Sequence, residues 1–125
     1  MRDQETVMLV DDEPSLLRLT KRTLESRGYR VLAASGAAEA IGLAEKHGEP
    51  ISLILTDVVM PEMNGWELSE RILSSYPKIK LMFMSGYASG IISPNGILAE
   101  GVTLLQKPFS MSALADKIRE TLDRN

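Results

Sequence analysis

The run from Leu53 to Asp57 limits the fold of this chain more than any other stretch. Apolar residues of strand length end there in one carboxylate, and Pro61 and Gly65 then stop the chain from continuing as a strand. A short apolar run bounded by such residues is typical of a strand that is buried on both faces. In an open parallel sheet the carboxyl ends of buried strands form the ligand crevice, so chemistry is expected at Asp57. The run alone fits equally well with Asp57 capping the turn that follows.

Four further segments of strand length alternate with segments whose apolar residues recur at helical spacing. These strand candidates are Thr6–Val10, Tyr29–Ala34, Ile79–Met84 and Val102–Leu105. The alternation predicts one α/β domain, in which five parallel strands are joined by right-handed crossovers and helices cover both faces of the sheet. Residues 86–101 contain four glycines and one proline, so any helix there is expected to be short or irregular.

The starts and stops of the helices are marked by residues with local preferences. Pro14 suits the first turn of a helix that Gly28 ends. Ser35, Asn64 and Ser110 are the expected N-caps of later helices. The residues expected to face the core are Leu16, Leu17, Thr20 and Leu24; Ala37, Ala40, Ile41 and Ala44; Leu68 and Ile72; and Leu114, Ile118 and Leu122.

Length and composition exclude several classes of protein. The 125 residues suffice for one domain, and a net charge of −3 does not favour direct binding to nucleic acid. The absence of cysteine excludes disulfides and thiolate chemistry. No apolar run reaches the roughly 20 residues of a membrane helix, and the N-terminus lacks the apolar core of a signal peptide. A cytoplasmic domain without membrane insertion is expected.

The expected sheet gathers polar residues at one rim, where the carboxyl ends of its strands meet. They are Asp11 and Asp12 after the first strand, Asp57 after the third, Ser85 after the fourth and Lys107 after the fifth. Two carboxylates about 4 Å apart repel by about 4 kcal/mol at an effective dielectric constant of roughly 20. A cation such as Mg²⁺ is therefore expected between them. Since Lys107 and Ser85 suit phosphoryl oxygens, the set predicts transfer of a phosphoryl group to Asp57.

Each of these residues also has an ordinary structural interpretation. Acids after strands often cap helices, a serine can satisfy a turn, and a single lysine is most often a solvated one. The ordered set, with each member at its own strand end, favours a site over these separate interpretations.

Four motifs resemble the receiver domain of two-component response regulators. They are Val10–Pro14, Thr56–Pro61 with Asn64 and Gly65 after it, Met84–Tyr87, and Gln106–Phe109. The match extends from about Thr6 to Leu122, so residues 1–125 are interpreted as a single receiver domain with its core in residues 6–122. The resemblance implies a flavodoxin-like, doubly wound three-layer sandwich with the strand order 2-1-3-4-5.

The resemblance also implies the chemistry of the site. Asp57 would accept a phosphoryl group from the phosphohistidine of a histidine kinase or a histidine phosphotransfer protein. Asp12, Asp57 and the backbone carbonyl of Val59 would bind Mg²⁺, for which Mn²⁺ can substitute. Asp11 would act on the metal through a water. Such a domain assists its own phosphorylation and dephosphorylation without being a conventional enzyme.

A switch follows from the charge of the new phosphoryl group, which is about −1.5 to −2. The resemblance implies that Lys107 pairs with the acyl phosphate and that Ser85 turns inward to hydrogen-bond it. The readout surface would be residues 86–105 together with the last helix. Leu104 stands where many receivers carry an aromatic residue, so backbone movement and Ser85 are expected to carry the switch.

Val59 and Tyr87 flank the approach of the water that would hydrolyse the phosphoryl group. An apolar and a bulky aromatic side chain should restrict that water. The phosphoryl group is therefore expected to last longer in the wild type than in Val59→Asn, and faster decay in the wild type would contradict this.

The context of the domain and its partners are further expectations. Met84–Ala88 and Leu114–Leu122 are similar to the C-terminal receivers of hybrid sensor histidine kinases, which predicts a module of such a kinase. A free-standing single-domain response regulator is the alternative. The sequence is also compatible with a homodimer that forms through the last helices.

Three other functions fit this sequence less well than a receiver domain does. A Mg²⁺-dependent aspartyl phosphatase or phosphotransferase usually needs a second acid two residues after its nucleophile, where this chain has Val59. A flavin-binding domain needs a phosphate loop after the first strand, where Asp11, Asp12 and Glu13 would repel a phosphate. A binding module that has lost phosphorylation usually lacks the acids or the lysine, and this chain has both.

Overall fold

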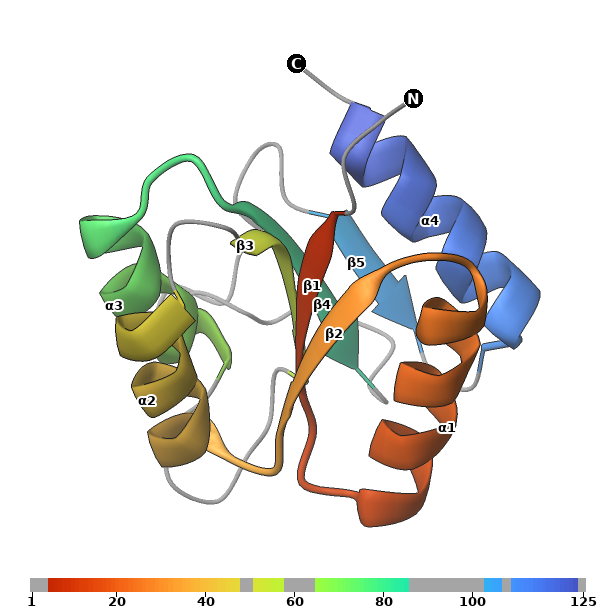
Figure 1. Cartoon of the computed structure of the whole chain (residues 1–125), viewed down its shortest axis with the longest axis horizontal. Helices are drawn as coiled ribbons and strands as arrows, with labels where there is room; N and C mark the ends of the chain where they lie inside the picture. The colour runs from red at the N-terminus through yellow and green to blue at the C-terminus, as the bar shows by residue number, and fades with distance from the viewer. Residues whose placement is uncertain (1–4, 48–50, 58–64, 86–102, 107–108, 124–125) are drawn as a thin grey trace.

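The computed structural model of the chain describes residues 5–47, 51–57, 65–85, 103–106 and 109–123. Within these residues, helices lie on both sides of a central sheet, so the architecture has three layers (Figure 1). The parallel α/β fold that the alternating pattern predicts is therefore confirmed. The helix considered for residues 86–101 lies outside the described residues.

All strand pairs of the sheet are parallel. The strands are β1 (Thr6–Val10), β2 (Arg30–Ala34), β3 (Ile51–Asp57), β4 (Lys80–Ser85) and β5 (Thr103–Gln106). They lie side by side in the order β2-β1-β3-β4-β5. Because β1 and β3 are neighbours in the middle of the sheet, the residues that follow them leave the same rim close together.

The described helices divide between the two faces of the sheet. They are α1 (Pro14–Ser26), α2 (Ala37–His47), α3 (Gly65–Ser75) and α4 (Met111–Asp123). Helices α1 and α4 cover one face, and α2 and α3 cover the other (Figure 1). Each helix turns an apolar stripe toward the sheet, as the helical spacing predicts.

The core consists of one apolar cluster on each face. Every residue of β1 is buried, as are Leu53 to Thr56 of β3, which confirms the prediction of strands buried on both faces. The cluster beneath α1 and α4 includes Val7, Leu9, Leu24, Leu53, Leu55, Leu114 and Ile118. The cluster beneath α2 and α3 includes Met8, Val10, Ala40, Ala44, Ile54, Leu68 and Ile72.

Gly28 ends α1 in the way its position predicts. Its φ angle is +97°, in the left-handed region where a residue without a Cβ is favoured. The N–H of Gly28 donates to the carbonyl of Glu25 at 3.1 Å, and the N–H of Tyr29 donates to the carbonyl of Leu24 at 3.1 Å. This pair of bonds is a Schellman motif. Since Tyr29 belongs to it, β2 begins one residue later than predicted, at Arg30.

The predicted N-caps have different outcomes. The hydroxyl of Ser110 accepts a hydrogen bond from the N–H of Ala113 at 3.0 Å, which confirms Ser110 as the cap of α4. The prediction for Ser35 is wrong, because Gly36 supplies the first carbonyl of α2. Ser35 instead donates from its N–H and its hydroxyl to the carboxylate of Glu39, at 2.7 and 3.0 Å. Asn64 lies outside the described residues.

Candidate functional site

Two of the predicted acids lie next to each other at the carboxyl rim of the sheet. Asp11 directly follows β1, and Asp57 is the last residue of β3. Val10 and Thr56 are partners in the register of these two strands, so each acid is one residue beyond a paired position. With Asp12 they form a group of three carboxylates, one oxygen from each lying within 4.8 Å of the others.

Local hydrogen bonds orient Asp11. A carboxylate oxygen of Asp11 accepts the N–H of Glu13 at 2.9 Å, and the N–H of Asp11 donates to the carbonyl of Ala34 at 3.1 Å. The first bond is a short turn that leads the chain into α1. Asp11 therefore stabilises the turn before α1 and also belongs to the cluster, because a carboxylate has lone pairs for several partners.

The cluster lies at the boundary between core and solvent. Asp11 is 2% exposed and Asp57 is 9% exposed, whereas the neighbouring Thr56 is fully buried. Asp12 is exposed. Asp57 thus keeps a small part of its surface exposed at the rim.

The carboxylate set fits a small hard cation. Oxygen ligands on one Mg²⁺ at about 2.1 Å lie no more than about 4.2 Å apart, close to the spacing in this cluster. Without a cation, three negative charges so close together, two of them poorly hydrated, repel one another strongly. The donor chemistry and the charge therefore both suit Mg²⁺ or Mn²⁺.

The other predicted site residues are placed only in part. Met84 is the register partner of Asp57, so Ser85 lies one residue further toward the rim on the adjacent strand. Nothing is described of the side chain of Ser85. Val59 and Lys107 lie outside the described residues, although Gln106, which precedes the lysine, pairs with Ser85 in the sheet. The roles of these three residues stay predictions.

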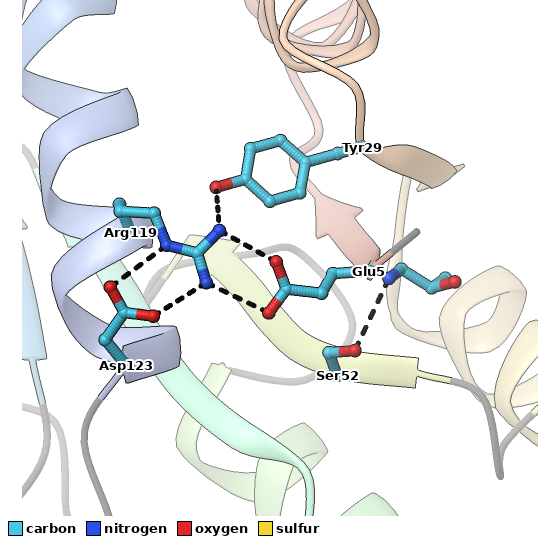
Figure 2. Close-up of polar contacts among 6 residues, drawn as sticks. Glu5, Tyr29, Ser52, Arg119 and Asp123 are labelled. Carbon is cyan, nitrogen blue, oxygen red and sulfur yellow. Dashed lines mark hydrogen bonds and ion pairs between the residues drawn. The ribbon is translucent and has the colours of Figure 1, made fainter. Parts of the chain in front are cut away.

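A polar network lies at the amino ends of the strands, opposite the acidic rim. The sequence does not predict it. Arg119 of α4 binds Glu5, Tyr29 and Asp123 (Figure 2). Arg119 and Asp123 are one helical turn apart, a spacing that the sequence shows. The contact with Glu5 crosses 114 residues, and no local pattern indicates it.

In the described part of the chain, no helix combines the length and the apolar character needed to cross a lipid bilayer.

Comparison with known proteins gives a consistent result. Residues 7–119 match the family model of the response regulator receiver domain. The chain is 38% identical over 119 residues to the sensor kinase CckA of Brucella abortus (strain 2308), covering 95% of the chain and 13% of that relative. It is 34% identical over 116 residues to the response regulator receiver protein CpdR of the same organism, covering 93% of the chain and 95% of that relative.

A solved structure of a receiver domain has the same fold as this chain. The receiver domain from the hybrid histidine kinase CckA superimposes with a TM-score of 0.80 at 31% identity, covering 94% of this chain and 99% of that one. The chain thus corresponds to a small part of one curated relative and to nearly all of another. On the matched family model, the shared flavodoxin-like fold and the acidic rim, the chain belongs to the response regulator receiver domain family.

Proposed function

We propose that Asp57 is the residue that accepts the phosphoryl group in this receiver domain. Receiver domains are the phosphoacceptors of two-component systems, and their family interacts with histidine kinases or phosphotransfer proteins. The observation that supports the assignment to Asp57 is the convergence of three carboxylates at the rim, with Asp57 at the end of the central strand β3. In the transfer, a carboxylate oxygen of Asp57 bonds to phosphorus as the bond from phosphorus to the histidine nitrogen breaks.

Asp12 and Asp57 are the proposed side-chain ligands of Mg²⁺, with the carbonyl of Val59 as a further ligand and Asp11 acting on the metal through a water. Receiver domains bind Mg²⁺ through acidic residues, and the carboxylates of this chain offer the hard oxygens that this ion prefers. When bound, the metal neutralises charge on the phosphoryl oxygens. Asp11, held by the N–H of Glu13, keeps the turn after β1 in a shape that leaves Asp12 at the rim.

Ser85 and Lys107 are proposed to respond to the phosphoryl group. The strand order β2-β1-β3-β4-β5 supports this, because β4 and β5 follow β3 in the sheet and bring their ends to the same rim. Lys107 would pair with the phosphoryl oxygens, and Ser85 would donate a hydrogen bond to them. Movement of these strand ends would then alter the surface of residues 86–105 and α4.

The test is phosphorylation by acetyl phosphate with Mg²⁺, followed by intact-mass measurement. The wild type should gain one phosphoryl group, and Asp57→Asn should gain none. Asp116→Asn is the matched control, because Asp116 is an exposed acid on α4 outside the cluster, and it should be phosphorylated like the wild type. Uptake by Asp57→Asn at the wild-type level would overturn the assignment of Asp57, and uptake unaffected by EDTA would overturn the metal site.

For the whole protein, we propose a module of a hybrid histidine kinase, because the chain is 38% identical to the CckA sensor kinase. The alternative is a free-standing regulator, which the 95% coverage of CpdR favours. An immunoblot of the protein from its own cells separates the two. A band near the 13.8 kDa of this chain would support the free-standing regulator, and a much larger band would support the kinase.

A further inference from the structure

The last turns of α4 are held by a bidentate ion pair. One terminal nitrogen of Arg119, Nη1, lies 2.8 Å from Oε1 of Glu5, and the other, Nη2, lies 3.0 Å from Oε2 (Figure 2). Parallel bonds of this kind fix both the distance and the plane of the two groups. Glu5 itself is anchored to the sheet, because its carbonyl accepts the N–H of Arg30 at 2.9 Å.

The remaining donors of the guanidinium are also used. Nε of Arg119 donates to Oδ2 of Asp123 at 3.2 Å, and Nη2 donates to Oδ1 at 2.9 Å. Nη1 also lies 3.3 Å from the hydroxyl of Tyr29, a residue that the Schellman turn after α1 holds in place. The network therefore joins α4 to the chain entering β1 and to the turn between α1 and β2.

The first half of α4 is held differently. Leu114 and Ala115 are buried, and Leu114 packs in the apolar cluster on the face that α1 and α4 cover. Ile118, one residue before Arg119, packs in the same cluster. Within the described part of the chain, residues 111–116 make no ion pair with another element. Apolar packing sets no fixed direction between the groups in contact, whereas a planar bidentate pair fixes both their distance and their plane.

The two halves of α4 also lie near opposite ends of the strands. The helix starts soon after β5, near the rim that carries the acidic cluster, and it ends beside the N-terminal end of β1 (Figure 1). The end held by directional polar contacts is therefore the one that is remote from Asp57. A displacement produced at the rim first reaches the end that lacks such contacts.

We infer that the Arg119 network is a pivot that fixes the far end of α4, so that phosphorylation displaces the start of this helix relative to its end. The inference rests on the proposed function, since phosphorylation of Asp57 supplies the displacement. The pivot converts a small shift at the carboxyl rim into a tilt of α4, which changes the surface that a partner contacts. Without the pivot, the whole helix would move together or fray at its end.

Hydrogen exchange measured by mass spectrometry tests the pivot. In the wild type, acetyl phosphate with Mg²⁺ should change exchange in residues 111–116 and leave residues 119–123 unchanged. In Glu5→Gln, which keeps the size of the side chain, exchange in residues 119–123 should be about fivefold faster, the factor that corresponds to about 1 kcal/mol. In this variant, phosphorylation should also change exchange in residues 119–123.

Two further variants provide a second disruption of the network and a control. Arg119→Lys keeps the positive charge but loses the planar guanidinium that makes the bidentate contact, so it should behave like Glu5→Gln. Lys117→Gln removes an exposed ion pair within α4, to Glu120 at 3.7 Å, and should behave like the wild type. An equal response of both halves of α4 in the phosphorylated wild type would overturn the pivot, as would wild-type exchange in Glu5→Gln.

Intact mass measured on the same samples separates the two proposals. If the wild type takes up no phosphoryl group, the proposed function fails and the pivot fails with it. If uptake occurs and the two halves of α4 respond equally, the pivot alone is wrong.

Discussion

Asp11, Asp12 and Asp57 place three negative charges at one edge of a buried sheet, with Asp11 and Asp57 largely removed from water. Such an arrangement reduces the stability of the folded state in the absence of a cation, since the carboxylates repel one another and lose hydration. The same arrangement is the proposed binding site for a divalent cation. At the scale of single residues, stability is therefore lost at the proposed site.

Replacing Asp57 should show how much the clustered charges lower the stability of the metal-free protein. Asp57→Asn removes one charge with almost no change in shape, so we expect the metal-free protein to gain about 1 kcal/mol in free energy of unfolding. Urea denaturation with and without Mg²⁺ measures the effect. Mg²⁺ should stabilise the wild type more than the variant, because it binds the folded wild type more tightly. A variant less stable than the wild type without metal would contradict the argument.

A second residue-scale effect concerns a buried hydroxyl. Thr20 is 2% exposed, and among the described residues its Oγ1 is the one buried side-chain oxygen without a hydrogen-bond partner. Thr20→Val replaces the hydroxyl with a methyl group of similar size, so the free energy of unfolding should rise by about 1 kcal/mol. Thermal or urea denaturation measures the difference.

Thr56 provides the matched control. It is also buried, with no exposed surface, but its hydroxyl donates to the carbonyl of Asp57 at 3.0 Å. Thr56→Val should therefore lower the free energy of unfolding by about 1 kcal/mol. If both valine variants shift stability in the same direction, hydrogen bonding of the hydroxyl does not decide the sign.

At the scale of elements, the turn after α1 and the middle of α2 give opposite expectations for one substitution. A Cβ added at Gly28 or at Gly42 would meet no atom within 4 Å, so crowding plays no part at either site. Gly28 has a positive φ angle, and Gly28→Ala should cost about 1 kcal/mol. Gly42 lies inside a helix, and Gly42→Ala should stabilise by about 1 kcal/mol. Denaturation of both variants beside the wild type checks the two signs together.

The helix starts show how far element-scale prediction reaches. Ser110 was predicted correctly as a cap, because the hydroxyl needs only the N–H groups of the turn that follows it. Ser35 has the same local preference, but a carboxylate four residues later, on Glu39, accepts its N–H and its hydroxyl. The hydroxyl of Ser35 thus donates to Glu39 and does not cap α2, and the local preference of serine alone does not show which partner it takes.

At the scale of the whole molecule, Arg119 joins the two ends of the described chain. Its side chain is 37% exposed, so solvent screening limits the loss in Arg119→Leu to about 1 kcal/mol of unfolding free energy. Lys117→Leu, which breaks only the exposed pair with Glu120, should change stability by less than about 0.5 kcal/mol. Urea denaturation of the two variants compares them directly.

The loss in Arg119→Leu should not depend on pH between neutral and mildly alkaline conditions. The hydrogen bonds that Arg119 donates to the carboxylate of Glu5 raise the pKa of Arg119 above its ordinary value, a shift that desolvation partly opposes. A raised pKa means that the contribution is fully present below the unfolded pKa and is lost only as pH rises through the folded pKa. Equal differences in unfolding free energy at pH 7 and pH 9 would agree with this, and a difference that shrinks by pH 9 would not.

The sequence by itself determined the elements and the identity of the acids at their ends. Burial on both faces of β1 and β3, the stop at Gly28 and the position of Asp57 all follow from residues that are near one another in the chain. These features are local, because strand and helix periodicity and turn conformation depend on a few consecutive residues.

The tertiary structure alone decided how close the predicted acids lie and which other distant groups meet. It brought the carboxylates of Asp11, Asp12 and Asp57 within 4.8 Å of one another, a spacing that their positions in the chain do not contain. It also paired Glu5 with Arg119 across 114 residues. The physical reason is that such contacts depend on strand order and on where each helix ends against the sheet, which are set by packing of the whole core.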